Sequence, residues 1–455
     1  MKSDESGPVI GRMNPPAAAI ASLNASGPVI GGMNPPAGAI ASLNESGPVI
    51  GGMNPPAGAI ASLNAFSLAA LLAPLTLEGF QRDYAERLPL YLDRAAPAWL
   101  ELLPGMRALD AVVGRAAGSG RVRLVRQGSA FPGPADALPA ILSAYAQGST
   151  IVVAKVQEES PSLGALAAAL QEGLEQPVGI NLYLTPPGAQ GFKEHADGHD
   201  VFILQLSGKK RWSVFQPVIE LPLESQVVRP PPLHEQILPP PPEGYGAPIL
   251  EATLARGQLL YLPRGFVHAA ATSEQGSAHL TIGVHALRHR DLLSEMVAVA
   301  AERARLLRET LPPLGRDRAR EVSAARALLQ AALDALADPG ALTEALARAE
   351  RRQARAATAC VGGSLEAIER CAALELNTML AHRRGTMAVA FLEAGKACLE
   401  FGGNRVDGPE ALLPTFELVA QRRRFTPADL PDELSSAAKL TLARRLIVEG
   451  LIIQS

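Results

Sequence analysis

The chain has 455 residues, of which 47% are hydrophobic and 19% charged, and its formal net charge is −3. This balance excludes a wholly disordered chain and a strongly basic surface that would attract nucleic acid. Its 41 Gly and 38 Pro make up about 17% of the residues, against roughly 12% in an average protein. The surplus of Gly and Pro must therefore be concentrated in particular segments.

The three cysteines, Cys360, Cys371 and Cys398, lie far apart and form no CxxC pair. Such spacing argues against a disulfide framework and against a structural zinc site. The first residues lack the apolar core of a signal peptide, and no run of apolar residues is long enough to span a membrane. We therefore expect a soluble, cytoplasmic protein with no membrane-spanning segment.

The N-terminal segment, residues 1–65, contains three nearly identical copies of a 20-residue unit. Each copy carries the strings SGPVIG, MNPP and AIASLN in that order. Ordering one unit costs roughly 30 kcal/mol, whereas burying its larger apolar side chains returns about 10–15 kcal/mol. One unit cannot fold alone, so we expect a flexible array, with a solenoid of stacked repeats as the alternative.

Two functions fit this array. It can be a linker or docking array produced by tandem duplication, or a set of peptide substrates presented in cis. The units contain no His, and Arg12 occurs only in the first copy. If the array is modified, the candidate modified residues are therefore Asn14, Asn34 and Asn54, or the prolines that follow them, because every unit has them.

The chain beyond residue 66 has the patterning of a folded protein. Helices are predicted within residues 80–90, 136–146 and 161–174. Short strands are predicted at 150–154, 178–184, 200–206, 211–215, 258–262 and 278–285. Many short strands separated by Gly and Pro favour an antiparallel barrel or jelly roll. Residues 217–248 contain ten prolines and form an insertion between these strands.

The C-terminal part is mainly helical. The chain is predicted to be helical for about 100 residues after His285, and the stretch 291–356 is rich in Ala, Leu, Arg and Glu. Residues 386–455 combine short strands with helices in a pattern typical of a winged-helix module. Residues 411–455 hold six Lys and Arg against five Asp and Glu. Binding to DNA phosphates needs a clear basic excess, so we interpret this module as structural or protein-binding. The overall fold class is α+β.

One short motif indicates a metal site. His195 and Asp197 are two residues apart, so on a strand both side chains lie on one face. His268 follows about 70 residues later. Two imidazoles and one carboxylate with open positions form the site of non-haem Fe(II) oxygenases. A chain with eight histidines can also place such residues by chance, and His199 and Asp200 are competing ligands.

The sequence around this motif resembles the cupin-like JmjC ribosomal oxygenases. The matching segments are NLYLTPP at 181–187, QGF at 190–192, the HxD motif at 195–197, DVFILQLSGKKRW at 200–212, LYLPRGFVH at 260–268 and SAHLT at 277–281. A weaker resemblance extends over residues 66–455. It implies a double-stranded β-helix (jelly-roll, cupin/JmjC) catalytic domain at 66–288, a helical dimerisation region at 289–385 and a winged-helix-like domain at 386–455.

The resemblance also implies a chemistry. Fe(II) would be held by His195, Asp197 and His268, with 2-oxoglutarate and O2 as co-substrates. Lys210 would pair with the far carboxylate of 2-oxoglutarate. The implied reaction is hydroxylation of a protein or peptide side chain, in ribosomal proteins on His or Arg.

Three further residues are candidates for contact with the co-substrate or for support of the ligands: Asn181, Tyr183 and Thr281. Packing is an equal interpretation for Tyr183 and Thr281, and His279 is expected to pack rather than bind metal. Two other functions stay open. One is a JmjC-type lysine demethylase, and the other is a cupin scaffold that binds metal without turnover and displays the repeats. The resemblance further implies a homodimer.

Overall fold

The computed structural model describes residues 65–455 except 127–128, 132–134, 191, 224–225, 227–243, 312 and 358–362. The repeat array, including Asn14, Asn34 and Asn54, lies outside the described residues, and so does most of the proline-rich insertion.

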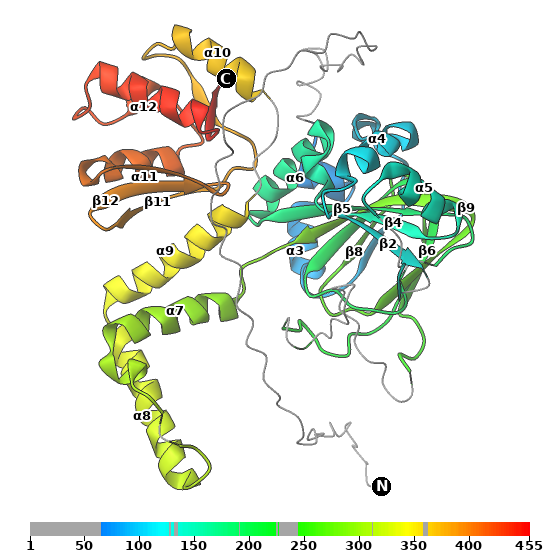
Figure 1. Ribbon diagram of the computed structural model, residues 1–455, viewed down its shortest axis with the longest axis horizontal. Helices are drawn as coiled ribbons and strands as arrows, with labels where there is room; N and C mark the ends of the chain where they lie inside the picture. Colours follow the sequence, from blue (N-terminus) through cyan, green and yellow to red (C-terminus); the bar gives the residue numbers. More distant parts are fainter. Residues whose placement is uncertain are drawn as a thin grey trace, which may run out of the picture. The chain divides into compact units, whose positions relative to one another are not determined.

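The core of the fold is a nine-stranded sheet in which every pair of neighbours is antiparallel, in the order β1-β8-β6-β9-β5-β4-β2-β3 with β7 beside β6 (Figure 1). Its strands are β1 (Leu90–Leu92), β2 (Val122–Arg126), β3 (Ser129–Ala130), β4 (Thr150–Val153), β5 (Val178–Thr185), β6 (Asp200–Val214), β7 (Leu250–Leu254), β8 (Leu259–Leu262) and β9 (His268–Val284). This all-antiparallel arrangement agrees with the jelly-roll prediction.

The two longest strands, β6 and β9, hold the barrel together. They pair along their whole length, with register shifts between Gln205 and Ser207 and between Gly208 and Lys210. The first part of β6 has β8 on its other side and the last part has β7. The prediction of two separate strands at 200–206 and 211–215 was wrong, because the chain passes the intervening glycine as a bulge without leaving the sheet.

Gly208 makes this bulge possible. Its φ is +65°, and a Cβ there would lie 1.8 Å from the carbonyl oxygen of Gly276. We expect Gly208→Ala to destabilise the protein by about 3 kcal/mol, since strain in φ adds to a backbone clash. Gly188 has φ +66° and open space at the Cβ position, so Gly188→Ala should cost only about 1 kcal/mol. Urea unfolding of both variants measures the difference, and equal losses would refute the clash.

Helices cover one face of this sheet, where α4, α5 and α6 are seen in Figure 1. The helices before and between the strands are α2 (Leu68–Leu72), α3 (Leu77–Asp83), α4 (Met106–Ala116), α5 (Leu138–Ala146) and α6 (Pro161–Leu174), with the short 3-10 helices η1 (Ala98–Leu102) and η2 (Val156–Glu158). Helix α6 has the predicted bounds, with Pro161 in its first turn, a position that proline favours.

The helix predicted at 80–90 is shorter and begins earlier than expected. Thr76 caps α3 by accepting a hydrogen bond from the Gly79 amide at 3.1 Å, and Glu86 takes a φ of +56°, which a helix does not allow. Leu90 pairs with Tyr261 in the sheet instead. Pairing with a strand more than 150 residues away therefore overrides the local helical pattern.

Alternation along β5 separates the core from the barrel interior. Ile180 and Leu182 are buried in the main core, which also takes apolar side chains from the covering helices. Asn181 and Tyr183 line a pocket inside the barrel. Since successive side chains on a strand point to opposite faces, one strand supplies both the packing with the helices and the wall of the pocket.

A helical region follows the barrel: α7 (His289–Arg303), η4 (Arg305–Arg308), α8 (Arg318–Leu336) and α9 (Pro339–Ala356). Val299 of α7 and Ala341 and Ala345 of α9 form a small buried cluster between these helices. Helix α8, all of whose residues are described, has no buried side chain.

The C-terminal part has its own hydrophobic core. Its elements are α10 (Ser364–Arg370), η5 (Cys371–Ala373), β10 (Leu380–His382), β11 (Ala388–Glu393), β12 (Lys396–Phe401), β13 (Asn404–Pro409), η6 (Glu410–Leu412), α11 (Leu413–Gln421), β14 (Arg424–Phe425), η7 (Pro427–Asp429), α12 (Ser436–Val448) and β15 (Ile452–Gln454). The strands form two three-stranded sheets.

The predicted boundary between residues 385 and 386 stays a prediction, although the hydrophobic cluster of the C-terminal part includes residues before it. Ala367, Leu374 and Leu380 are buried in the same cluster as Phe416 and Leu446, so this core begins about 20 residues before the boundary. The winged-helix interpretation of the module stays a prediction. Within the described residues, no helix is both long enough and apolar enough to cross a membrane.

Candidate metal centre and co-substrate pocket

Backbone pairing brings the two candidate histidine ligands together. The amide of His195 donates to the carbonyl of His268 at 3.1 Å, and the amide of His268 donates to the carbonyl of His195 at 2.7 Å. The pair forms an isolated antiparallel bridge, and the two imidazole centroids lie 4.3 Å apart. A mutual pair of backbone hydrogen bonds therefore fixes the spacing of two side chains that are 73 residues apart in the chain.

Both imidazoles are oriented in the same way. Nδ1 of His195 lies 2.8 Å from the carbonyl oxygen of Lys193, and Nδ1 of His268 lies 3.0 Å from that of Phe266. A carbonyl oxygen only accepts, so Nδ1 must carry the proton in each ring. Each ring thus presents the lone pair of Nε2, which is the form that a metal ion binds.

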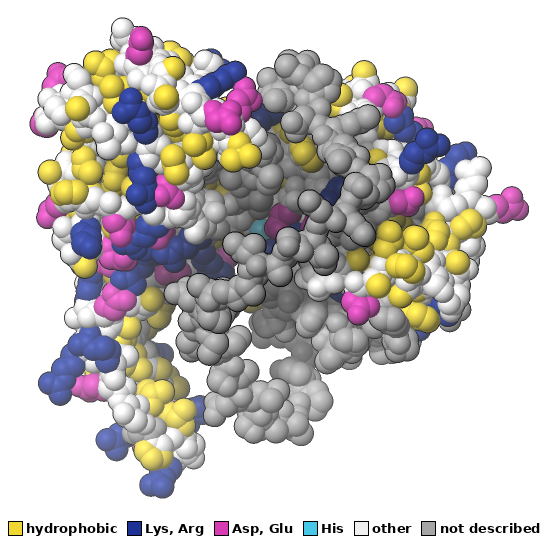
Figure 2. Space-filling view, turned by 45° about the horizontal axis from the view of Figure 1, so that its top comes forward, with side chains coloured by type: hydrophobic (Ala, Val, Ile, Leu, Met, Phe, Trp, Pro, Cys, Tyr) yellow, Lys and Arg dark blue, Asp and Glu magenta, His cyan; other side chains and the backbone are white. Residues whose placement is uncertain are grey.

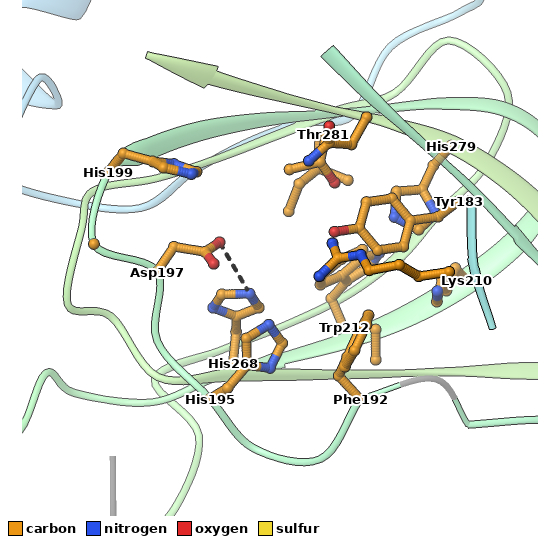
Figure 3. A pocket seen from close by; sticks show the side chains of 15 residues that line it. Tyr183, Phe192, His195, Asp197, His199, Lys210, Trp212, His268, His279 and Thr281 are labelled. Atoms are coloured by element: carbon orange, nitrogen blue, oxygen red, sulfur yellow. Dashed lines mark ion pairs between the residues drawn. The ribbon is translucent and has the colours of Figure 1, made fainter. Parts of the chain in front are cut away.

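Asp197 completes the triad. Its Oδ2 lies 3.7 Å from Nε2 of His268, and one ligand atom from each of the three residues falls within 4.8 Å of the others. The expectation that His195 and Asp197 lie on a regular strand was wrong, since His195 makes only the isolated bridge and Asp197 lies in the loop before β6. The extended loop still brings both side chains to the same point (Figure 3).

Burial and neighbouring groups favour the deprotonated forms of His268 and Asp197, which are the forms that bind a cation. Burial, with a contribution from His195, lowers the pKa of His268 to about 4, so its ring is neutral at pH 7. Burial alone would raise the pKa of Asp197, but the imidazoles of His268, His199 and His195 outweigh it and bring the pKa below its ordinary value. The triad therefore offers a carboxylate and a neutral imidazole donor at neutral pH.

The two competing ligands have other positions. The ring of His199 packs edge-on against that of His285, with centroids 5.1 Å apart, and it lines the pocket outside the triad. The Asp200 carboxylate accepts from the Tyr261 hydroxyl at 2.6 Å and from the Arg264 amide at 3.0 Å. Burial and this carboxylate raise the pKa of Tyr261. Asp200 thus anchors the start of β6.

We expect Asp200→Ala to destabilise the fold by about 3 kcal/mol, because it leaves the buried Tyr261 hydroxyl and the Arg264 amide without their acceptor, although the Arg264 guanidinium keeps its ion pair with Glu86. Mn(II) affinity should change less than about threefold, since the carboxylate points away from the triad. Thermal unfolding and Mn(II) titration measure the two effects. A variant of normal stability that had lost the metal would show instead that Asp200 is a ligand.

The triad lies in a pocket of about 240 Å³ inside the barrel. Figure 3 shows Lys210, His279 and Tyr183 on one side of the triad and His199 on the other. All seven site residues predicted from the sequence line this pocket: His195, Asp197, His268, Lys210, Asn181, Tyr183 and Thr281.

Lys210 is a buried cation at the end of the pocket away from His199. Its Nζ donates to the Thr185 hydroxyl at 3.2 Å and lies 5.7 Å from the centre of the Trp212 ring. Burial lowers the pKa of Lys210 to about 7, and within the described residues it forms no ion pair with a carboxylate. A buried ammonium group without a counter-ion is costly, so this end of the pocket fits an anionic group of a ligand.

The three candidate supporting residues occupy two neighbouring strands. Asn181 and Thr281 are directly opposite each other in the β5–β9 register, and the Asn181 side-chain oxygen accepts from the Lys155 amide at 3.2 Å. Tyr183 stacks on His279 with centroids 4.8 Å apart and ring planes 9° from parallel. His279 therefore packs beside Lys210, as expected, and is not one of the three grouped metal ligands.

Sequence reasoning assigned no role to several other lining residues, among them Arg123, Phe192 and Trp212. Trp212 follows Lys210 by two residues on β6, so strand alternation could have placed it on the same face. Arg123 lies on β2, three strands along the sheet from β9 with its ligand His268, and no local signal distinguishes it. Buried Trp212 Nε1 and His279 Nδ1 have no hydrogen-bond partner among the described residues, which leaves the indole N–H as a donor, and one imidazole nitrogen, for a polar ligand.

The residues present fit the two groups that the sequence implied. Two imidazoles and one carboxylate leave the open positions that a catalytic Fe(II) needs. The buried ammonium and the unpaired donors fit a dicarboxylate such as 2-oxoglutarate between Lys210 and the triad.

Comparison with known sequences agrees with this geometry. Residues 154–292 match the JmjC domain family. Two relatives are a bifunctional lysine-specific demethylase and histidyl-hydroxylase NO66 from Drosophila persimilis and ribosomal oxygenase 1 from Rattus norvegicus. The first is 31% identical over 54% of this chain and 36% of its own length, and the second is 34% identical over 47% of this chain and 36% of its own. The chain thus spans about a third of the length of these relatives.

Solved structures share the fold over a longer stretch. The Escherichia coli ribosomal oxygenase YcfD superposes with a TM-score of 0.51 at 17% identity, covering 84% of this chain and 98% of that one. A second structure of YcfD, in complex with cobalt and 2-oxoglutarate, superposes equally well. At this identity the match concerns the fold.

Proposed function

Because the chain belongs to the JmjC-domain ribosomal oxygenases, we propose that it hydroxylates a protein or peptide side chain with Fe(II), 2-oxoglutarate and O2. The observation that carries the proposal is the pairing, in one pocket, of a metal triad with a buried ammonium that forms no ion pair with a carboxylate in the part of the chain that the structure describes. A buried ammonium without a counter-ion is costly, so the Lys210 end of the pocket favours an anionic ligand.

The lining residues have two proposed functions, binding of the metal and binding of the co-substrate. His195, Asp197 and His268 would hold the metal, and Lys210 would bind the far carboxylate of 2-oxoglutarate. Trp212, Tyr183 and His279 close the pocket around the co-substrate. When bound, Fe(II) supplies activation of O2, which converts 2-oxoglutarate to succinate and CO2 and places the second oxygen atom on a C–H bond of the substrate. Asn181 and Thr281 would support this assembly from β5 and β9.

We propose two sources of substrate, the chain's own repeats and ribosomal proteins. The repeats are tethered to the catalytic domain, which gives them a high effective concentration. The test is intact-mass and peptide-mass measurement after anaerobic loading with Fe(II) and 2-oxoglutarate and then exposure to O2. A gain of one oxygen per unit within residues 6–64, absent in His195→Ala, would support modification in cis at Asn14, Asn34 and Asn54 or the adjoining prolines.

Other outcomes of this experiment separate the alternatives. Succinate formation with an unmodified array would indicate a separate substrate, which purified ribosomal proteins would test. No succinate under any of these conditions would refute the oxygenase and favour a scaffold that binds metal without turnover.

A demethylase is the second candidate, because the name of a relative includes lysine demethylation beside histidyl hydroxylation. Hydroxylation of an N-methyl group releases formaldehyde, whereas hydroxylation of a carbon in the side chain does not. The test measures formaldehyde and succinate with and without a methyl-lysine peptide. Formaldehyde released with the peptide, faster than the background succinate formation seen without it, would favour demethylation.

We further propose that the helical region forms a homodimer. Several large apolar side chains on it are exposed: Leu293 and Val297 on α7, Val322, Leu329 and Leu333 on α8, and Leu342 and Leu346 on α9. Apolar side chains lie among charged ones at the lower left of Figure 2. Exposed apolar surface of this kind commonly marks an interface. Light scattering of wild type and of Leu329→Glu with Leu333→Glu tests it, and a wild-type monomer would refute it.

A further inference from the structure

The loop that carries Asp197 is held by few backbone contacts. Residues 196–199 lie outside the regular strands. The carbonyl of Asp197 accepts from the Gly265 amide at 3.0 Å. The next carbonyl, that of Gly198, accepts from the guanidinium of Arg288. These two hydrogen bonds fix the two peptide units that follow the carboxylate ligand.

Arg288 reaches this loop from the start of the helical region. It is the N-cap residue of α7, and its own amide donates to the Asp291 carboxylate at 3.0 Å. The preceding amide, that of Leu287, donates to the Gln176 side chain at 3.1 Å. The base of the Arg288 side chain is therefore fixed by the barrel on one side and by the first turn of α7 on the other.

The same guanidinium also contacts the start of the proline-rich insertion. Its second terminal nitrogen lies 3.5 Å from the carbonyl of Pro222. A Cβ on Gly265 would lie 2.6 Å from both the Ile219 carbonyl and the Pro222 ring, so the loop that binds Asp197 is in close contact with this segment as well. Arg288 thus joins three segments behind the metal centre.

The contact matters because glycine has the greatest backbone freedom of any residue. Without a partner for its carbonyl, the peptide unit between Gly198 and His199 can rotate, and the Asp197 side chain loses its fixed direction. A hydrogen bond from a charged guanidinium is about twice as strong as one between neutral groups. Groups that orient metal ligands in this way typically change metal affinity by about 10- to 100-fold.

We propose that Arg288 is a positioning residue for the metal ligand Asp197, and that through this contact metal binding and the first turn of α7 stabilise each other. The proposal rests on the metal site of the proposed function, but it does not depend on turnover or on the identity of the substrate. The reciprocal effect follows from linkage, since a contact that favours metal binding must itself be favoured by the metal.

The test uses the full-length chain and Mn(II), a redox-stable probe for the site. We expect Arg288→Ala to weaken Mn(II) binding by about 10- to 100-fold, with Arg288→Lys recovering part of the loss. Arg290→Ala is the matched control, because Arg290 lies in the same turn and is exposed; it should bind Mn(II) like wild type. Unfolding temperatures of the metal-free proteins monitor folding.

Hydrogen exchange separates positioning from a merely structural role. In the wild type, Mn(II) should slow exchange of the Asp291 and Leu292 amides, which bond to the Arg288 carbonyl. In Arg288→Ala this response to Mn(II) should be absent, whereas a structural role would raise exchange equally with and without metal. Equal Mn(II) affinity in wild type and Arg288→Ala would overturn the positioning role of Arg288 but not the metal site. Failure of the wild type to bind Mn(II) would overturn the metal site itself.

Discussion

His268→Ala is expected to lose metal binding and 2-oxoglutarate turnover together. The imidazole is buried and neutral at pH 7, and its hydrogen bond to the Phe266 carbonyl fixes its orientation with Nε2 free. It therefore meets the requirements of a metal ligand. Substitutions that only orient a ligand cost about 10- to 100-fold, so removing a ligand should cost at least about a hundredfold. Mn(II) titration and succinate formation measure the two losses.

The fold should tolerate this substitution. It removes one hydrogen bond to a backbone carbonyl, worth about 1 kcal/mol, and the Asp197 carboxylate loses His268 but keeps His199 and His195 nearby. The unfolding temperature of the wild type should rise with Mn(II), because a metal that binds only the folded protein stabilises it. The unfolding temperature of the variant should not change. His289→Ala, an exposed histidine at the start of α7, is the control. A variant that still gained stability from Mn(II) would contradict the assignment.

The second large effect concerns Lys210 and pH. Its pKa is about 7 in the free protein because the ammonium is buried. A dicarboxylate binds the protonated form, so the neutral form that predominates above pH 7 must take up a proton on binding. We expect 2-oxoglutarate to bind about tenfold more weakly at pH 8 than at pH 6, and about a hundredfold more weakly at pH 9.

Variants at Lys210 and its neighbour separate this effect from other titrations. Lys210→Met has similar volume and no charge, and it should bind 2-oxoglutarate weakly at every pH, with most of the pH dependence lost. Lys209→Met, at an exposed position, should keep the wild-type profile. Fluorescence of Trp212, which lines the pocket, reports binding. A flat wild-type profile would contradict the role of Lys210.

Local sequence signals predicted elements well where local and tertiary preferences agree. Helix α6 begins at Pro161 and ends at Leu174, as predicted, because proline at its start and an apolar face both favour it. Helix α3 ends at Asp83, before the predicted end, because Leu90 is required in the sheet opposite Tyr261. The bulge at Gly208 likewise joins two predicted strands into one.

In the candidate site, too, some residues could be suggested from local sequence and others depend on tertiary contacts. Residue types and spacing suggested His195, Asp197 and His268 as metal donors, since a metal needs particular donors and strands place every second side chain on one face, whereas Lys210 followed from the family resemblance. Spacing could not exclude Asp200, whose carboxylate turns to Tyr261 and Arg264. Nor could it identify Arg123, which reaches the pocket from a strand that pairs through β4.

The sequence by itself predicted the antiparallel sheet and suggested the donors of the metal site, because strand alternation and donor chemistry are properties of residue type and short spacing; Lys210 followed from the family resemblance, and the roles of these site residues stay predictions. Only the tertiary structure decided which carboxylate faces the metal, which nitrogen of each imidazole is free, and how Arg288 holds the loop between them. The first and the last depend on hydrogen bonds between residues that are up to 90 positions apart, which become neighbours only when the chain has folded. The second depends on the backbone conformation that turns the Lys193 and Phe266 carbonyls toward the imidazoles.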